Sequence, residues 1–178
     1  MEKLPETICV ALNLKLEKIA ENHAEDLLFQ INSHREYLDQ FVDWTKFNNT
    51  LQDALEFVNR SQLEAKNGES FTWAICYQGR AVGTISFNSL IDWQNKTVMI
   101  GYWLSPDVQK KGIITHSIEQ LIERTKSYFN NYILKCAEHN IRSNLVAQRC
   151  GFKFIKKIEN GEQICGKWYT QNMYQKQI

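Results

Sequence analysis

The hydrophobic period of the sequence changes sharply around Pro106, and this change limits the folds open to the chain. Before it, Thr97–Leu104 is a β-rich run that the proline ends. After it, apolar residues recur at helical spacing, namely Ile113, Ile114, Ile118, Leu121 and Ile122. Tyr132–Cys136 is short and β-rich again. A strand, a helix and a strand in this order predict a crossover that joins parallel strands of one sheet.

Two further β-rich runs precede the crossover. Ser70–Tyr77 and Arg80–Ser89 flank Gln78-Gly79, which predicts a tight hairpin turn. With Thr97–Leu104 they form a three-strand meander. The predicted sheet is therefore antiparallel at first and becomes parallel where the helix crosses it, which gives a mixed α/β (α+β) fold.

The remaining segments complete this fold. Ile8–Leu16 reads as one strand, and residues 23–47 have helical spacing. A helix over Leu51–Lys66 is capped at Asn49-Thr50 and stopped at Asn67-Gly68. A short helix over Ile141–Cys150 ends at Gly151. Two last strands, Phe152–Ile158 and Gln163–Tyr174, flank a predicted hairpin turn at Glu159-Asn160-Gly161.

Composition supports one globular domain over residues 1–178. The chain is 43% hydrophobic, and its Lys and Arg (21) nearly balance its Asp and Glu (20), so no basic surplus favours nucleic-acid binding. No segment has the pattern of a signal peptide or a membrane span. We therefore expect a soluble cytoplasmic protein without direct nucleic-acid or membrane partners.

The five cysteines predict free thiols in a reducing compartment, because their number is odd and no two have C-x-x-C spacing. Cys136 and His139 form one C-x-x-H pair without a second pair of ligands, so no metal site is expected. A nucleophilic Cys136 beside His139 is an alternative, although a buried structural cysteine is the commoner arrangement.

The loop before the crossing helix is a candidate anion site. It contains Gln109, Lys110, Lys111 and Gly112 directly before the helical pattern. Gly112 allows a ligand to approach the backbone closely, and the N–H groups of a helix N-terminus attract phosphate. The same residues also suit a solvated helix cap, and the loop alone leaves both interpretations open.

A second segment, Asn140–Phe152, helps to interpret the loop, because the two together form a recognisable pattern. The runs I-G-Y-W-L, Q-x-x-G-I-I-T and N-x-x-S-N-x-V-A-x-R-x-G-F occur in this order. The combination resembles the GNAT superfamily of N-acetyltransferases, and within it the ribosomal-protein-serine acetyltransferases. The resemblance covers nearly the whole chain and includes F-V-D-W-T, S-F-N and N-M-Y.

The resemblance implies acetyl-coenzyme A as the acetyl donor, held in a slot between two splayed parallel strands. The backbone of Tyr102, Trp103 and Leu104 would hold the pantetheine arm. The loop would bind the pyrophosphate through Gln109, Lys110, Lys111, Gly112, Ile113, Ile114 and Thr115. Asn140 and Asn144 would contact the cofactor further along.

Two positions depart from the superfamily pattern. Ile114 stands where Gly or Ala is usual, a substitution that this branch tolerates. Ala147 stands where many members have a tyrosine as general acid. The branch implies that Ser143 protonates the departing thiolate instead, although Ser143 also suits a helix N-cap.

The resemblance also assigns the base. An ammonium must lose a proton before it attacks, and Glu162 falls where the branch keeps a glutamate for this role. From sequence alone, Glu162 is also an ordinary exposed residue of a hairpin. A backbone N–H near Leu104 would stabilise the oxyanion, and Trp44 would lie near the acceptor groove.

The predicted function is transfer of acetyl from acetyl-coenzyme A to an amine by direct attack in a ternary complex. The resemblance favours the N-terminal α-amine of a ribosomal protein as the acceptor. The alternative acceptor is a small amine such as a polyamine, an aminoacyl conjugate or an antibiotic. A non-catalytic acyl-coenzyme A sensor is a third interpretation, supported by Ala147. Relatives of the branch are often dimers, so the resemblance allows a homodimer, for which the sequence gives no direct signal.

Overall fold

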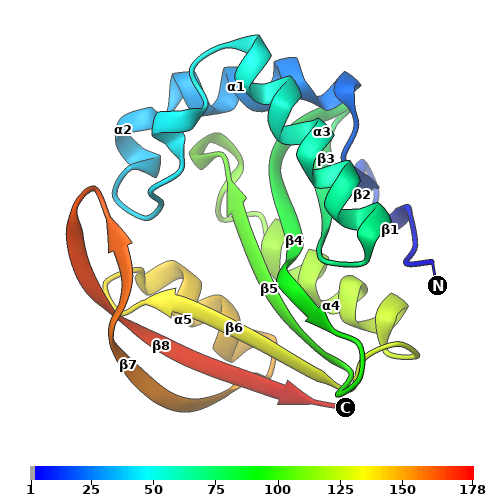
Figure 1. Cartoon of the computed structure of the whole chain (residues 1–178), viewed down its shortest axis with the longest axis vertical. Coiled ribbons are helices and arrows are strands. Elements are labelled where there is room, and N and C mark those ends of the chain that lie inside the picture. The colour runs from blue at the N-terminus through cyan, green and yellow to red at the C-terminus, as the bar shows by residue number, and fades with distance from the viewer. Residues whose placement is uncertain (1–2) are drawn as a thin grey trace.

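Eight strands form one sheet in the order β1-β2-β3-β4-β5-β6-β8-β7 in the computed structural model, which describes residues 3–178 (Figure 1). The strands are β1 Thr7–Ala11, β2 Leu14–Lys18, β3 Phe71–Tyr77, β4 Arg80–Asp92, β5 Thr97–Leu104, β6 Asn131–Ala137, β7 Lys153–Ile164 and β8 Lys167–Gln177. Neighbours are antiparallel except β5 and β6, which are parallel. The mixed fold predicted from the sequence is confirmed.

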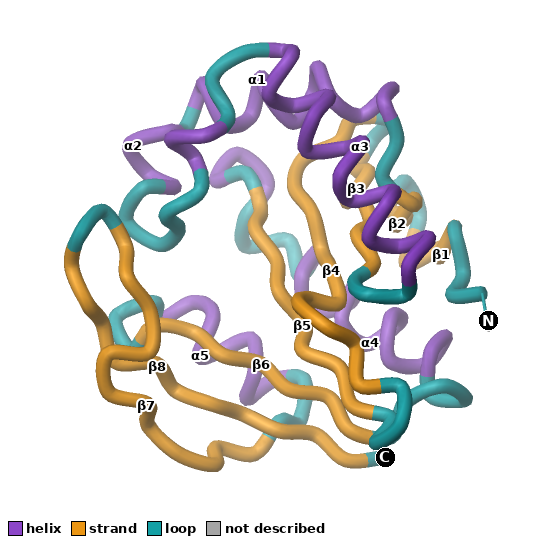
Figure 2. The backbone as a smooth tube through the Cα atoms, viewed as in Figure 1, coloured by secondary structure: helices purple, strands orange, loops and turns teal. Residues whose placement is uncertain are grey.

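Helices cover both faces of this sheet (Figure 2). They are α1 Ala24–Ser33, α2 Arg35–Leu38, α3 Leu51–Asn67, α4 Ile113–Thr125 and α5 Ile141–Arg149, with short 3-10 turns η1 Glu21–His23, η2 Thr45–Phe47 and η3 Pro106–Val108. Ala74 and Cys76 of β3 pack with α1 and α3, whereas Trp73 and Ile75 belong to the core that α4 covers. Alternate residues of one strand thus define the two faces.

The parallel pair is short. Cα pairing of β5 with β6 runs from Thr97 opposite Asn131 to Ile100 opposite Leu134. Beyond this point β5 stays paired only with β4, and β6 only with β8. Figure 1 shows the two strands diverging toward the end where α2 lies. The predicted splayed slot is therefore present.

An aromatic cluster holds the paired end of the two strands together. Phe87 of β4 lies 5.3 Å, centroid to centroid, from Phe129 and 6.4 Å from Tyr132 of β6. The Tyr132 hydroxyl is 2.9 Å from Thr125 Oγ1 at the end of α4. All four side chains are buried. Because large buried aromatics contribute strongly to core packing, this cluster stabilises the closed end of the slot.

Several local predictions are confirmed. Strand β5 has the predicted bounds, and α3 begins after Thr50 and ends at Gly68, whose φ is 74°. Gln78 and Gly79 both have positive φ, 50° and 78°, as a two-residue type I′ hairpin turn requires.

Three predictions about element boundaries are wrong. Residues 8–16 form two strands joined at Leu12-Asn13 rather than one. The helical segment 23–47 is broken, and His34 at φ −131° separates α1 from α2. The last hairpin turns at Cys165-Gly166, both with positive φ, and not at 159–161, which forms an irregularity inside β7. Asn-Gly there mimics a turn, but pairing with β8 continues on both sides of it.

Within residues 3–178, none of the helices combines the length and the apolar composition needed to cross a bilayer.

Gly83 fixes how closely β4 approaches β5. A Cβ at this position would lie 2.1 Å from the Trp103 carbonyl oxygen and 3.0 Å from Leu104 Cα. We expect Gly83→Ala to lower the free energy of unfolding by about 2 kcal/mol, as overpacking does, in urea denaturation. Gly101→Ala is the matched control, because its Cβ would meet the Asn88 side-chain amide. An equal or smaller loss for Gly83→Ala than for the control would contradict this account.

Candidate active site

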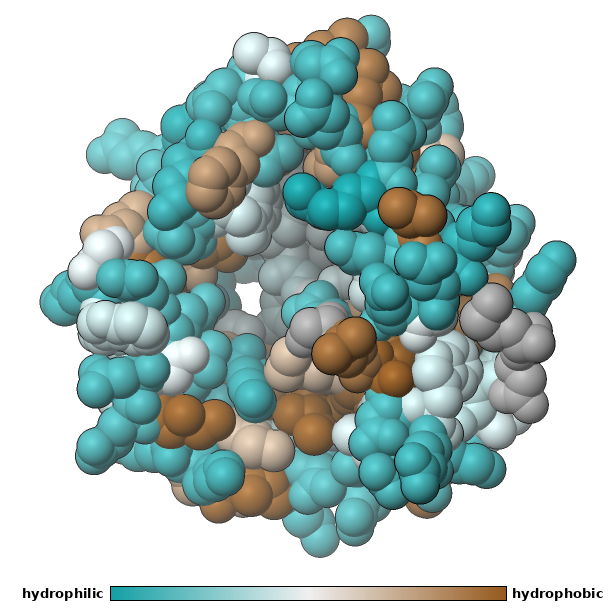
Figure 3. Space-filling view, in the orientation of Figure 1, coloured by the Kyte–Doolittle hydropathy of each residue, from teal (hydrophilic) through white to brown (hydrophobic). Residues whose placement is uncertain are grey.

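A cavity of about 1370 Å³ occupies the gap between the diverging strands. Its lining comes from both faces of the sheet, with α1, α3 and the 37–48 connector on one side and the 109–115 loop and α5 on the other. Figure 3 shows it as a hollow near the centre of the molecule, open through to the far side in that view. Its volume exceeds what one small ligand requires, so two substrates can meet within it.

The exposed edge of β5 is the first element of this site. From Gly101 to Leu104 the strand has no partner on the β6 side among the described residues. Its backbone groups there can bind an extended ligand as an added strand would. Tyr102 and Leu104 pack toward the face of α4, whereas Trp103 packs toward α1 and α3 and lies 5.5 Å from Trp44, centroid to centroid.

The loop between β5 and α4 is the second element. Lys110 and Gly112 have left-handed φ values of 64° and 73°. Gly112 is the N-cap of α4 and supplies no side-chain cap, so the first N–H groups of this 13-residue helix remain available for an anion. Residues 109, 110 and 112–115 line the cavity, whereas the exposed Lys111 does not.

Two hydrogen bonds tie this loop to the segment around α2. Gln109 Nε2 donates to the Tyr37 hydroxyl at 2.8 Å, so the Gln109 amide is already engaged. His34 Nε2 lies 2.9 Å from Asp107 Oδ2. The loop that borders the α4 side of the cavity thus contacts directly the segment that borders the opposite side.

Ser143 and Asn140 lie together at the start of α5. Asn140 Oδ1 accepts from the Ser143 N–H at 3.3 Å, so Asn140 is the N-cap and the capping role considered for Ser143 is wrong. Ser143 Oγ is instead 2.7 Å from the Tyr102 hydroxyl across the slot. Both residues line the cavity.

Asn144 does not reach the cavity, contrary to the sequence prediction. It is 8% exposed, and its Nδ2 donates to the carbonyl oxygens of Ala137 and Asn140. Its Oδ1 accepts from Asn172 Nδ2 and the Tyr174 hydroxyl. Because every polar atom of the side chain is bonded within the protein, Asn144 fixes α5 on β6 and β8.

Glu162 lies on the cavity wall opposite α5. Gln171 Nε2 donates to Glu162 Oε2 at 3.1 Å, and Gln171 is paired with Ala137 at the end of β6. The neighbouring Asn172 points the other way, to α5. Burial raises the pKa of the Glu162 carboxyl, and the Gln171 hydrogen bond and the charge of His139 oppose this effect. A carboxylate with a raised pKa is a better proton acceptor.

Some lining residues were missed from the sequence. Arg142, Val146 and Arg149 lie along one side of α5, and Arg60 and Phe57 belong to α3. Their spacing of three or four residues is the helical signal that could have found them. The thiol of Cys136 also lines the cavity, and burial raises its pKa to about 11, partly offset by its contact with the Ser143 hydroxyl. A thiol in this state is a poor nucleophile.

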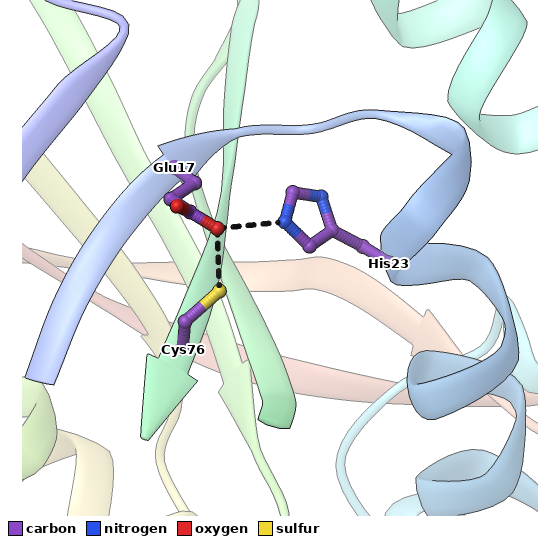
Figure 4. A group of neighbouring side chains, drawn as sticks. All are labelled: Glu17, His23 and Cys76. Carbon is purple, nitrogen blue, oxygen red and sulfur yellow. Dashed lines mark hydrogen bonds and ion pairs between the residues drawn. The ribbon is translucent and has the colours of Figure 1, made fainter. Parts of the chain in front are cut away.

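Glu17, His23 and Cys76 form a separate cluster outside the cavity lining (Figure 4). His23 Nε2 and Cys76 Sγ lie 3.1 and 3.4 Å from Glu17 Oε2. The Ala20 N–H donates to His23 Nδ1 at 3.1 Å, so in the neutral ring the proton is on Nε2. Burial and Glu17 raise the pKa of the Cys76 thiol to about 12. Protons therefore occupy two would-be metal ligands, and the cluster acts as a hydrogen-bond network.

The cavity between splayed strands thus brings together a helix N-terminus and a half-buried glutamate. The family model for the acetyltransferase (GNAT) domain matches residues 13–153. The chain belongs to the GNAT acetyltransferase family. It is therefore an N-acetyltransferase, and acetyl-coenzyme A is its acetyl donor.

Individual GNAT relatives agree with this. The ribosomal-protein-serine acetyltransferase of Escherichia coli (strain K12) is 31% identical over 173 residues, 96% of each chain. The microcin C7 self-immunity acetyltransferase MccE, solved with acetyl-CoA and AMP, has a TM-score of 0.93 at 34% identity, over 98% of this chain and 97% of that one. The ribosomal alpha-N-protein acetyltransferase RimL, solved with coenzyme A, has a TM-score of 0.92 at 28% identity, over 97% and 98%.

We expect Gly112→Ala to weaken coenzyme A binding about tenfold in isothermal titration calorimetry. A side chain in the left-handed region costs roughly 1–2 kcal/mol, and this backbone precedes the anion-binding N–H groups. Lys111→Ala is the control, because Lys111 is outside the cavity lining. The affinity of this variant for coenzyme A should stay within about twofold of the wild-type value. Unchanged affinity in a folded Gly112→Ala protein would exclude this loop as the pyrophosphate site.

Proposed function

We propose that this GNAT enzyme acetylates the N-terminal α-amine of a ribosomal protein. The observation that carries the proposal is the arrangement of the cavity, in which Glu162 and Ser143 come from opposite faces of the sheet and face one slot. The match to a ribosomal-protein-serine acetyltransferase over 96% of both chains supports this acceptor.

In the proposed reaction, acetyl-coenzyme A lies along the β5 edge with its pyrophosphate at the N-terminus of α4. The loop residues at 109, 110 and 112–115 and the Asn140 side chain hold it. Glu162, directly or through water, takes one proton from the acceptor ammonium. The free amine then attacks the thioester carbon, and an N–H of the β5 edge near Leu104 stabilises the oxyanion.

Collapse of the tetrahedral intermediate completes the transfer. The C–S bond breaks, and sulfur keeps the bonding pair and receives a proton through the Ser143 hydroxyl. The nitrogen loses its surplus proton to solvent, Ser143 recovers its own from solvent, and Glu162 releases to solvent the proton that it took from the ammonium. The products are the amide and coenzyme A with a free thiol.

Cys136 indicates where the sulfur of the cofactor lies. The RimL structure is described with its coenzyme A in a disulfide with a cysteine of that protein. In this chain Cys136 is the one buried cysteine among the described residues that line the cavity. We infer that the coenzyme A sulfur lies next to Cys136, within reach of the Ser143 hydroxyl.

A second acceptor class is favoured by a specific observation. MccE, at 34% identity, is described with AMP as well as acetyl-CoA. The α3 side of this cavity is lined by Trp44 and Phe57, and the Arg60 guanidinium carbon lies 5.8 Å from the Phe57 ring centre. Aromatic rings beside a cation suit a nucleobase and a phosphate. The second candidate is therefore the α-amine of an aminoacyl nucleotide, a small-molecule conjugate.

The acceptor is identified by mass spectrometry after incubation with acetyl-coenzyme A. Separate reactions contain a peptide with the N-terminal sequence of a ribosomal stalk protein, the same peptide with a blocked N-terminus, a non-hydrolysable aminoacyl adenylate and spermidine. We expect one acetyl group on the free peptide and none on the blocked one. Acetylation of the adenylate alone would replace the first acceptor by the second. Cofactor binding without transfer to any amine would favour the sensor interpretation.

We expect Glu162→Gln to lower kcat by about 10²–10⁴, because the base is lost while the cofactor contacts remain. The Kd of acetyl-coenzyme A should not change. Glu159→Gln is the matched control, since Glu159 is an exposed carboxylate of the same strand. A normal kcat for Glu162→Gln would remove Glu162 from the mechanism.

The pH dependence provides a second check on the same residue. Burial raises the Glu162 pKa, so its carboxylate is lost as pH falls through a value above the usual range of glutamate. The apparent pKa of the acid limb of the kcat/KM profile should therefore lie above that range, and Glu162→Gln should abolish this limb. An acid limb that persists in Glu162→Gln would assign it to another group.

A further inference from the structure

The Tyr102 side chain bridges the slot at the point where β5 and β6 have separated. Tyr102 follows Ile100, the last residue of β5 that is paired with β6. Its hydroxyl lies 2.7 Å from Ser143 Oγ at the start of α5. This contact joins the exposed edge of β5 to the helix that carries the proposed acid.

The direction of this hydrogen bond follows from the surroundings. Burial raises the pKa of the Tyr102 phenol, so the hydroxyl keeps its proton. Among residues 3–178, Ser143 is its one hydrogen-bonding partner, and a shielded O–H without an acceptor is costly. Tyr102 therefore donates and Ser143 Oγ accepts.

This direction leaves the hydrogen of Ser143 free for another acceptor. Ser143 lines the cavity, so a ligand bound there can supply this acceptor. The Ser143 main-chain N–H is held separately by Asn140 Oδ1. The serine thus has a fixed main chain, an occupied lone pair and one O–H left for a ligand in the cavity.

We propose that Tyr102 is a positioning residue that directs the Ser143 O–H at the coenzyme A sulfur. A serine hydroxyl rotates freely, and an incoming hydrogen bond from Tyr102 removes the rotamers in which its hydrogen points to β5. A hydroxyl that accepts a hydrogen bond is also a stronger donor. This inference rests on the proposed role of Ser143. It assigns a role to the side chain of Tyr102, of which only the backbone has been given a role so far.

Tyr102→Phe removes the hydroxyl and keeps the ring and the β5 backbone. We expect kcat for the N-terminal serine peptide to fall about tenfold, with KM for acetyl-coenzyme A within about twofold. The kcat of Ser143→Ala should be about a hundredfold below that of the wild type. The double variant should have the same kcat as Ser143→Ala, because Tyr102 acts only through Ser143. Tyr132→Phe is the matched control, since it removes a buried tyrosine hydroxyl that contacts Thr125 outside the cavity lining. It should keep the wild-type kcat.

A second readout does not need an acceptor. The pKa of the bound coenzyme A thiol is titrated through its thiolate absorbance, as the difference between complex and free protein. A directed donor favours the thiolate, so this pKa should rise by about one unit in Tyr102→Phe and in Ser143→Ala, and stay constant in Tyr132→Phe.

The outcomes separate the two levels of inference. Ser143→Ala with normal kcat and normal thiol pKa would refute the proposed acid. If Ser143→Ala is impaired but Tyr102→Phe matches the wild type in both measurements, only the role of Tyr102 is refuted. Losses that multiply in the double variant would show that Tyr102 acts independently of Ser143, which also overturns the proposal.

Discussion

The separation of β5 and β6 after Ile100 and Leu134 is the constraint on which the site depends. A sheet normally satisfies the backbone groups of neighbouring strands against each other. Here that pairing stops while both strands continue, and the edge of β5 is left without a strand on its β6 side. The aromatic cluster around Phe87 and Tyr132 keeps the other end closed. The fold therefore presents an extended ligand with unpaired backbone groups that are already in place.

The sheet also separates the two halves of the chemistry. Alternate residues of β5 point to opposite faces, so Tyr102 contacts the helix that carries Ser143 while Trp103 contacts Trp44. On the second wall of the slot, Gln171 holds Glu162 and Asn172 holds Asn144. In the proposed mechanism, the proton acceptor for the amine and the proton donor for the sulfur thus face one slot without contacting each other.

Sequence reasoning located the elements that depend on local signals. The proline after β5, the cap of α3 and the Gln78-Gly79 turn each act over a few residues, and their positions follow from residue type. The hairpin turn predicted at residues 159–161 was wrong, because an Asn-Gly pair can lie in a turn or inside a strand and only the register with β8 decides between them. The cofactor contact predicted for Asn144 was wrong for a similar reason, since its hydrogen-bonding partners Asn172 and Tyr174 are distant in sequence. The Tyr102–Ser143 contact spans 41 residues and has no local signal.

The hydrogen bonds that join the 105–112 loop to α2 affect how the two substrates bind. Gln109 donates to Tyr37, and Asp107 contacts His34, so the loop at the proposed pyrophosphate site is bonded to the segment beside the proposed acceptor groove. When a cofactor orders this loop, the same bonds restrict the α2 segment. Thermodynamic linkage makes such coupling reciprocal, so each substrate changes the affinity for the other by the same factor. The two substrates of this enzyme are thus expected to bind interdependently, whichever of them binds first.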